Sequence, residues 1–203
     1  MILKENGGGK EFEQASSGNH IARCVGLIDL GTQQSEYQGK TTYARKIVVR
    51  FELPNELMAE GDYAGKPFLV SKFYTASLSE KANLRKDLES WRGRPFTDKE
   101  LMGFDSKNLL DKPCMVNVVH TEKGKAKIAS IAPVPKGMDI PPRINEVLFF
   151  SLEPSEFKQS TYEGLAEFYK GEIQKSPEWL ELQDGGPRKP TAPAGFDEED
   201  IPF

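Results

Sequence analysis

The segment Thr41–Leu53 reads TTYARKIVVRFEL, and from Lys46 onward its residues alternate between two faces. The two faces consist of Ile47, Val49, Phe51 and Leu53 on one side and Lys46, Val48, Arg50 and Glu52 on the other. A period of two is typical of a β-strand with one buried face. The segment therefore predicts a long strand, which Pro54 should end because proline cannot donate to a sheet ladder.

Two more strands flank this one along the chain. Ile21–Leu30 is rich in β-forming residues, and Gly26 within it predicts a bulge or bend. Phe68–Leu78 predicts a third strand. The polar, glycine-bounded segment Gly31–Lys40 is expected to be the hairpin connection between the first two strands.

A helix is expected after the third strand. Apolar residues recur at helical spacing after Ser79, the predicted N-cap, and the pattern stops near Gly93. The apolar stripe of this helix consists of Ala82, Leu84, Leu88 and Trp91. Thr97–Leu110 predicts one or two short helices, in which Thr97 and Glu100 have the spacing of a capping box.

The order of these elements indicates the fold. Met115–His120 and Ala126–Ile131 predict two further strands, and Glu122–Lys125 predicts the turn between them. Three strands, one helix and two strands is the element order of the OB-fold, a five-stranded barrel with a helix between strands 3 and 4. We expect this fold over residues 20–135, with a small β-sandwich as the alternative. A parallel α/β fold would need helices and strands to alternate throughout.

The other segments are expected to surround this core. Residues 1–19 predict a flexible N-terminal arm, and residues 136–183 predict an extension that either packs on the core or forms a subunit interface in a homo-oligomer. Residues 184–203 are rich in Gly, Pro and charge, which predicts a disordered acidic linker and tail. The chain is thus predicted to be mainly β with helices, of the α+β class.

Within the extension, three elements are predicted. Glu146–Leu152 is expected to be a strand and Tyr162–Lys175 a helix. Ser176-Pro177-Glu178 has the pattern that starts another short helix.

The distribution of charge along the sequence favours nucleic-acid binding, and its composition argues against a membrane protein. The formal net charge of the 203 residues is −4, but residues 20–132 carry more basic than acidic side chains and the residues after them are acidic. Such asymmetry is typical of a nucleic-acid-binding body with an interaction tail. The sequence has no apolar run of membrane-spanning length and only two cysteines, so we expect a cytoplasmic protein without membrane contact.

Catalytic and metal-binding motifs do not stand out in the sequence. No serine-nucleophile, zinc-protease or dinucleotide-binding motif is present, so we expect no enzyme and no cofactor. A metal-dependent nuclease is the enzymatic alternative. The potential zinc ligands are His20, Cys24, Cys114 and His120. Positions 20 and 24 of one strand lie about 13 Å apart, too far for one tetrahedral zinc, so we expect no metal and two buried cysteines.

Basic and aromatic residues gather where OB-folds bind oligonucleotides, on strands 2 and 3 and in the flanking loops. Cations neutralise phosphates and aromatic faces stack on bases. On the third strand we expect Tyr74 to be the stacking residue and Phe73, on the opposite side, to lie in the core. The candidate DNA-binding residues are Tyr37, Lys40, Tyr43, Arg45, Lys46, Arg50, Lys72, Tyr74, Arg92, Arg94, Lys123 and Lys125, with Lys127 beside the last two.

Several of these candidates have a structural alternative. Tyr43 and Arg45 are in phase with the core residue Ile47 and could cap the barrel instead. Lys46 and Arg50 could form an ordinary exposed face. Trp91, next to Arg92, is expected in the core because it is in helical register with the apolar stripe.

The last seven residues of the sequence carry a resemblance to a known family. They read DEEDIPF and follow a Gly/Pro-rich segment. This end resembles the C-terminal tip of bacterial single-stranded-DNA-binding proteins, and the overall pattern is similar to that of a phage-encoded OB-fold protein of this class. The resemblance implies recruitment of replication or recombination proteins in the host cytoplasm, through a partner's apolar pocket with a cation beside it. The tip residues are Asp197, Glu198, Glu199, Asp200, Ile201, Pro202 and Phe203.

Together these observations predict sequence-tolerant binding and protection of single-stranded DNA during phage replication or recombination. Two alternatives remain open from the sequence. One is an adaptor that captures a host replication protein through the tip without binding DNA. In the other, the acidic tail only aids solubility.

Overall fold

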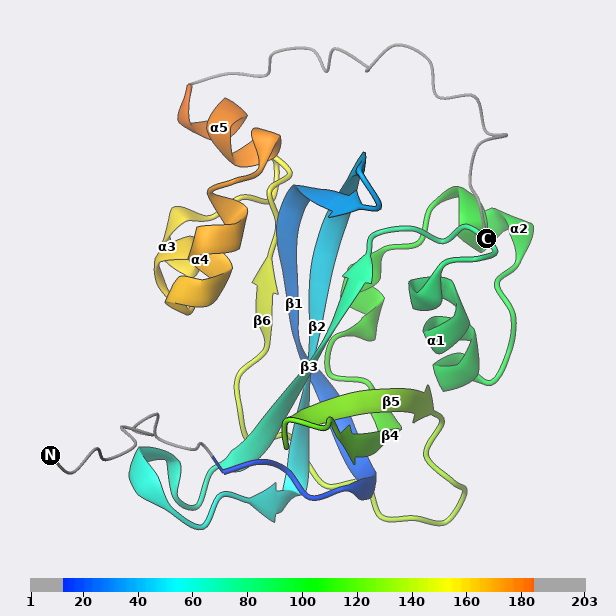
Figure 1. The fold of residues 1–203 in the computed structure, drawn as a ribbon. Coiled ribbons are helices and arrows are strands. Elements are labelled where there is room, and N and C mark those ends of the chain that lie inside the picture. The colour runs from blue at the N-terminus through cyan, green and yellow to red at the C-terminus, as the bar shows by residue number, and fades with distance from the viewer. Residues whose placement is uncertain (1–12, 185–203) are drawn as a thin grey trace, which may run out of the picture.

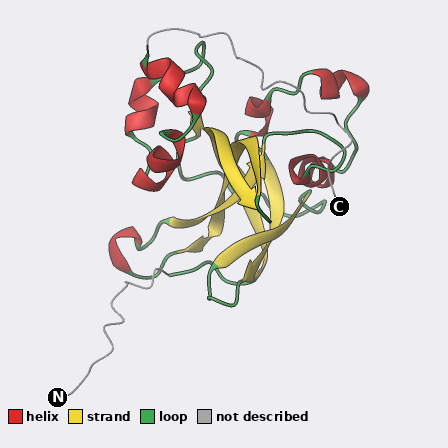
Figure 2. Cartoon of the chain, turned by 45° about the horizontal axis from the view of Figure 1, so that its top comes forward, coloured by secondary structure: helices red, strands yellow, loops and turns green. Residues whose placement is uncertain are grey.

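The chain folds around a six-stranded sheet in the computed structural model, which describes residues 13–184 apart from the side chain of Tyr37. The antiparallel strand order is β3-β2-β1-β4-β5, and β6 pairs in parallel with β1. Helices lie on both sides of the sheet (Figures 1 and 2). The strands are β1 (Gly18–Tyr37), β2 (Lys40–Leu57), β3 (Pro67–Thr75), β4 (Pro113–His120), β5 (Ala126–Ala132) and β6 (Leu148–Phe150). The helices are η1 (Gly61–Tyr63), α1 (Asn83–Arg92), α2 (Asp98–Met102), η2 (Ser106–Leu109), α3 (Gln159–Glu163), α4 (Glu167–Ile173) and α5 (Pro177–Gln183).

These elements confirm the α+β class and a mostly antiparallel sheet. The ladder does not close into a barrel, because β3 and β5 are its two ends and do not pair. Two predicted segments lie largely outside the described residues. They are the first twelve residues of the flexible arm predicted over 1–19, and the predicted tail and tip from residue 185 onward. No helix among the described residues has the length and apolar character needed to cross a membrane.

The β1–β2 hairpin is longer than its sequence pattern predicts. Its two turn residues, Gln38 and Gly39, both have positive φ (49° and 75°), as a two-residue hairpin turn requires. The prediction that Pro54 ends β2 is wrong, since the strand continues to Leu57. An irregularity in the pairing of β2 with β3 between Leu53 and Leu57 accommodates the proline, which has no N–H to donate.

Helix α1 covers the inner face of the sheet and follows the predicted stripe. Leu84, Leu88 and Trp91 are buried, and Gly93 ends the helix in the left-handed conformation. The N-cap is Ala82 and not the predicted Ser79. The capping box between Thr97 and Glu100 is confirmed at the start of α2. The core between α1 and the sheet includes Ala22, Leu27, Val49, Phe51, Leu53, Val116 and Ile128.

The extension builds a second core on the outer face of the sheet. Ile28, Leu30 and Val48 of the sheet pack against side chains from β6 and α3–α5, including Phe150, Tyr162, Ile173 and Trp179. The single helix predicted over Tyr162–Lys175 is wrong, because the chain breaks between α3 and α4 and buries Leu165 at the break. The predicted start of α5 is confirmed, since the Ser176 hydroxyl accepts a hydrogen bond from the Trp179 N–H (3.2 Å).

Residues just before β1 pack on the sheet, although the sequence predicts a flexible arm up to residue 19. Ala15 is buried in the inner core. The Glu13 carboxylate accepts a hydrogen bond from the Ala59 N–H (2.8 Å), and the Gln14 side-chain oxygen accepts one from the Ala126 N–H (3.0 Å). The ordered body therefore begins before residue 20.

Gly31 marks the place where α5 meets β1, and its substitution gives a first test of the packing. Its φ is +70°, and a Cβ placed there would lie 2.4 Å from the Ser176 Cβ. The next residue, Thr32, donates its N–H to the Glu178 carboxylate (2.8 Å). We expect Gly31→Ala to lower the free energy of unfolding by about 2–3 kcal/mol, from backbone strain and displacement of α5. Urea denaturation measures this loss.

A matched glycine separates the two causes. Gly39 also has positive φ (+75°), but an added Cβ would meet nothing within 4 Å. Gly39→Ala should therefore cost only backbone strain, about 1 kcal/mol. Equal losses in the two variants would contradict close packing of α5 on Gly31.

Candidate nucleic-acid interface

A row of side chains crosses the outer face of the sheet from β1 to β3. Ile28 pairs with Val48, and Val48 pairs with Phe73. Directly opposed residues of antiparallel strands point to the same side, so all three side chains face outward. The extension buries Ile28 and Val48, but its cover stops short of β3. Phe73 is therefore left 51% exposed at the edge of the second core.

An exposed ring of the extension contacts Phe73. Phe168 on α4 is 61% exposed, and its ring lies perpendicular to that of Phe73 with the centroids 6.2 Å apart. Both rings line a cavity of about 850 Å³ between α4, the outer face of the sheet and the loop after β3. Its lining also includes Leu30, Gln33, Lys46, Thr75, Lys81 and Glu172.

A second hollow adjoins the first at Phe73. It has a volume of about 400 Å³ and lies at the gap between the unpaired edges of β3 and β5. It shares Phe73, Tyr74 and Asn83 with the larger cavity. We call the two hollows together the Phe73 groove. Its second half is lined by Lys72, Lys86, Asp87, Val119, Lys127 and Ala129, among others.

The charges lining the Phe73 groove are mostly positive. Five lysines face two acidic residues, and both acids are already paired: Glu172 with Lys175 (2.6 Å) and Asp87 with Lys72 (2.7 Å). The Lys46 ammonium donates to the neutral Thr75 hydroxyl (2.8 Å). Lys86 and Lys127 have no ion pair within the described part of the chain. The five lysines are Lys46, Lys72, Lys81, Lys86 and Lys127.

The prediction that Phe73 lies in the core and Tyr74 faces outward is wrong, because the two side chains lie on the opposite faces. Tyr74 is only 5% exposed, packs in the inner core and donates its hydroxyl to Asp87 (2.8 Å). This burial, together with the carboxylate, raises the pKa of Tyr74. The reason is strand parity: Phe68 and Val70 fill the inner core, so Tyr74 points inward with them and Phe73 points outward.

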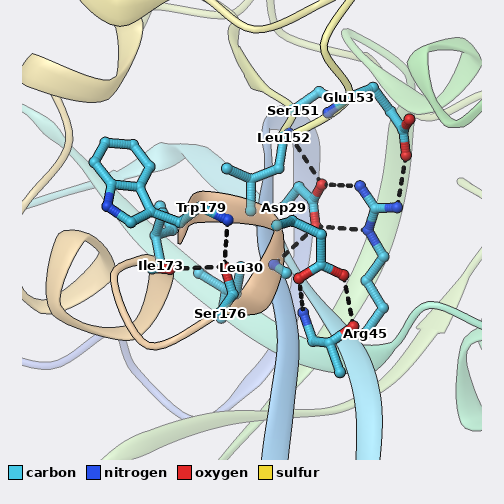
Figure 3. A network of polar contacts seen from close by, with 12 residues as sticks. Asp29, Leu30, Arg45, Ser151, Leu152, Glu153, Ile173, Ser176 and Trp179 are labelled. Carbon is cyan, nitrogen blue, oxygen red and sulfur yellow. Dashed lines mark hydrogen bonds and ion pairs between the residues drawn. The ribbon is translucent and has the colours of Figure 1, made fainter. Parts of the chain in front are cut away.

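Arg45 serves the fold in this structure. Its guanidinium donates to the buried Asp29 through Nε (3.1 Å) and Nη2 (2.5 Å), and to Glu153 through Nη1 (2.6 Å) (Figure 3). The hydrogen bond to Asp29 is the main cause of a raised pKa for Arg45. Asp29 also accepts from the Leu152 N–H (3.1 Å), so this network ties the hairpin to the extension. We therefore leave Arg45 out of the interface.

Arg92 and Arg94 lie away from the Phe73 groove and share one carboxylate. Both guanidinium groups pair with Glu100, and hydrogen bonds from Arg94 first, then from the Thr97 N–H and Arg92, hold the pKa of Glu100 well below its usual range. Arg92 also lies over the ring of Phe96, 4.3 Å from its centroid. Trp91 confirms the core prediction, since it is buried and donates its indole N–H to the Pro113 carbonyl (2.8 Å).

Of the remaining candidates, those whose side chains the structure describes line neither half of the Phe73 groove. Tyr43 is 64% exposed on the distal hairpin, near Lys40. Lys123 and Lys125 are exposed in the turn between β4 and β5. The side chain of Arg50 crosses the β1 backbone at Gly26, where an added Cβ would lie 3.0 Å from the Arg50 Cβ. The side chain of the remaining candidate, Tyr37, lies outside the described residues.

The potential zinc ligands have other contacts. Cys24 and Cys114 are fully buried, and burial raises the pKa of the Cys24 thiol to about 12. His20 bonds to the Ser16 carbonyl (2.9 Å), and His120 bonds to the Ala15 carbonyl (2.8 Å). Among residues 13–184 no three His, Cys, Asp or Glu side chains are grouped to hold a metal ion.

Sequence reasoning missed Phe168, Lys81 and Lys86, and it misplaced Phe73. The parity of Phe68, Val70 and Tyr74 on β3 was a signal that could have placed Phe73 outside. No signal in the sequence could have paired Phe168 with it, because their contact depends on how the extension folds back. Comparison with known proteins gives no further guide, since no protein family and no curated protein matches this sequence.

Proposed function

We propose that this protein binds single-stranded DNA along the Phe73 groove, with little dependence on sequence. The exposed Phe73–Phe168 pair among five lysines carries this proposal. Aromatic faces stack on any base, and lysines follow a phosphate backbone without reading it. The described lining of the groove carries five lysines and two acids, so its formal charge is positive and suits a polyanion.

The proposal includes an OB-fold for the core of the protein, and such a fold would support the same function. Along the chain, β1, β2 and β3 precede α1 and β4 and β5 follow it, which is consistent with the element order of that fold. The ends of the sheet approach each other, since the Lys72 ammonium donates to the Ala129 carbonyl (3.4 Å) across the gap from β3 to β5. OB-folds bind oligonucleotides on strands 2 and 3, where Lys46 and Phe73 lie.

The proposal extends to a biological role. A sequence-tolerant, non-catalytic binder would coat and protect single strands during phage DNA replication or recombination. The acidic segment Asp197–Phe203, outside the described residues, would then recruit replication proteins, because an acidic run before Ile-Pro-Phe suits a basic, apolar pocket.

Fluorescence anisotropy of a labelled oligothymidine tests the binding directly. We expect affinity for the single strand to exceed that for a duplex of equal length, and to fall as salt rises, with a slope of about −0.7 per phosphate contact. The measurement is repeated on a variant without Asp197–Phe203, so that an acidic segment cannot block the groove. Absence of binding by both proteins at low salt would overturn the proposal and favour an adaptor without a DNA site.

A further inference from the structure

The Phe73–Phe168 pair joins a residue of a paired strand to a mostly exposed residue of a helix. Phe73 is part of β3, where the strand is held by β2. Phe168 is in the first turn of α4, and its side chain is mostly exposed. The helix itself is fixed to β1, because the Gln33 side chain donates to the Glu172 carbonyl (2.9 Å) and to the Leu30 carbonyl (2.7 Å). The backbones are therefore held while the Phe168 ring can turn.

The two rings are about 1 Å closer than one planar group between them would require. Stacked bases are about 3.4 Å apart along a strand, so a base between two parallel rings needs about 7 Å between the ring planes. The ring centroids are now 6.2 Å apart and the rings are perpendicular. A change of the Phe168 side-chain torsions that turns its ring and moves it about 1 Å away from Phe73 would admit a base, at the cost of its edge-to-face contacts with Phe73 and Tyr169.

Positive charge lies beside the two rings. Lys46 and Lys81 line the same cavity, on β2 and on the loop before α1. A nucleotide whose base lies between the rings would place its phosphates toward these walls, where an ammonium can pair with them. Glu172 on the same wall is neutralised by Lys175 (2.6 Å). An apolar peptide would match the rings but would not complement the positive charge of this part of the lining.

We infer that Phe73 and Phe168 form a clamp that takes one nucleobase of the bound strand, so that the extension supplies half of a stacking site. This inference rests on the proposed function. It adds that a sheet residue and a helix residue, 95 positions apart, hold the same base.

Substitution of Phe168 tests the clamp on the full chain. We expect Phe168→Leu to weaken oligothymidine binding roughly 5- to 100-fold, the effect of losing one base–aromatic stack. Phe168→Trp should restore most of the affinity, because it restores a flat ring. Tyr63→Leu is the matched control, since Tyr63 is similarly exposed but lies on η1 outside the groove.

A second readout locates the base itself. An oligothymidine with a single 5-iodouracil should cross-link on irradiation to peptides containing Phe73 or Phe168, and Phe168→Leu should remove the second cross-link. Circular dichroism verifies that each variant is folded. Oligothymidine binding that is unchanged in Phe168→Leu, or cross-links elsewhere only, would overturn the clamp and leave DNA binding intact. Absence of binding by the unaltered protein would overturn the proposed function as well.

Discussion

Replacing Lys46 and Lys127 together with glutamate is expected to lower the affinity for oligothymidine roughly 30-fold or more. The two lysines lie in the two halves of the Phe73 groove. A charge-assisted contact contributes about 1–2 kcal/mol, and every 1.4 kcal/mol changes the dissociation constant tenfold. The salt slope should also become smaller by about 1.4, because two phosphate contacts are lost. Anisotropy titrations at several salt concentrations measure both quantities.

The control for this variant must carry the same charge change elsewhere. Lys99 on α2 and Lys136 after β5 are exposed and line neither half of the groove. Lys99→Glu with Lys136→Glu alters the long-range field equally, so it should slow association without removing contacts. If both double variants lose the same affinity, general charge and not the groove governs binding. If neither loses any, the groove does not bind DNA.

The second large effect concerns stability. We expect Asp29→Asn to lower the free energy of unfolding by about 3 kcal/mol. The Asp29 carboxylate is nearly buried and accepts from the Gly31 N–H (3.0 Å), the Leu152 N–H (3.1 Å) and two nitrogens of Arg45. An asparagine oxygen cannot accept all these bonds, and it leaves Arg45 without its main counter-charge. Urea denaturation followed by circular dichroism gives the value.

The outer end of the same network provides the comparison. Glu153 pairs with the same guanidinium, but half of its side chain is exposed. Glu153→Gln should therefore cost less than about 1 kcal/mol, because water screens an exposed ion pair. If Asp29→Asn costs no more than Glu153→Gln, the network contributes little to holding the extension on the sheet.

Much of the inner half of the fold could be predicted from local pattern. The alternation around Val49 placed β2, and the apolar stripe before Gly93 placed α1, because both depend on residues within a few positions of each other. Pro54 was misleading, since proline disrupts a strand only where its missing N–H would have a partner. The break between α3 and α4 could not be predicted, because burial of Leu165 in the second core decides it.

The candidate site was harder to predict than the strands, because it also depends on contacts between residues far apart in the sequence. Lys46 and Lys72 were found because they are on strands with a clear period. Arg45 looks like an exposed cation in the sequence, yet its partner Glu153 is 108 residues away. Phe168 acquires its role from a contact of similar separation. Contacts between residues so far apart leave no local pattern in a single sequence, so they could not be predicted from it.

The pairing of β6 with β1 has a consequence for the newly made chain. Leu148 lies beside Gly26, roughly 120 residues earlier in synthesis. At about 5–20 residues per second, a ribosome needs roughly 6–24 s to produce that distance. Until then the edge of β1 at Gly26–Ile28 is open, and the side chains of Ile28, Leu30 and Val48 have no cover from the extension. We therefore expect the nascent protein to pass through an interval in which this exposed apolar surface favours aggregation.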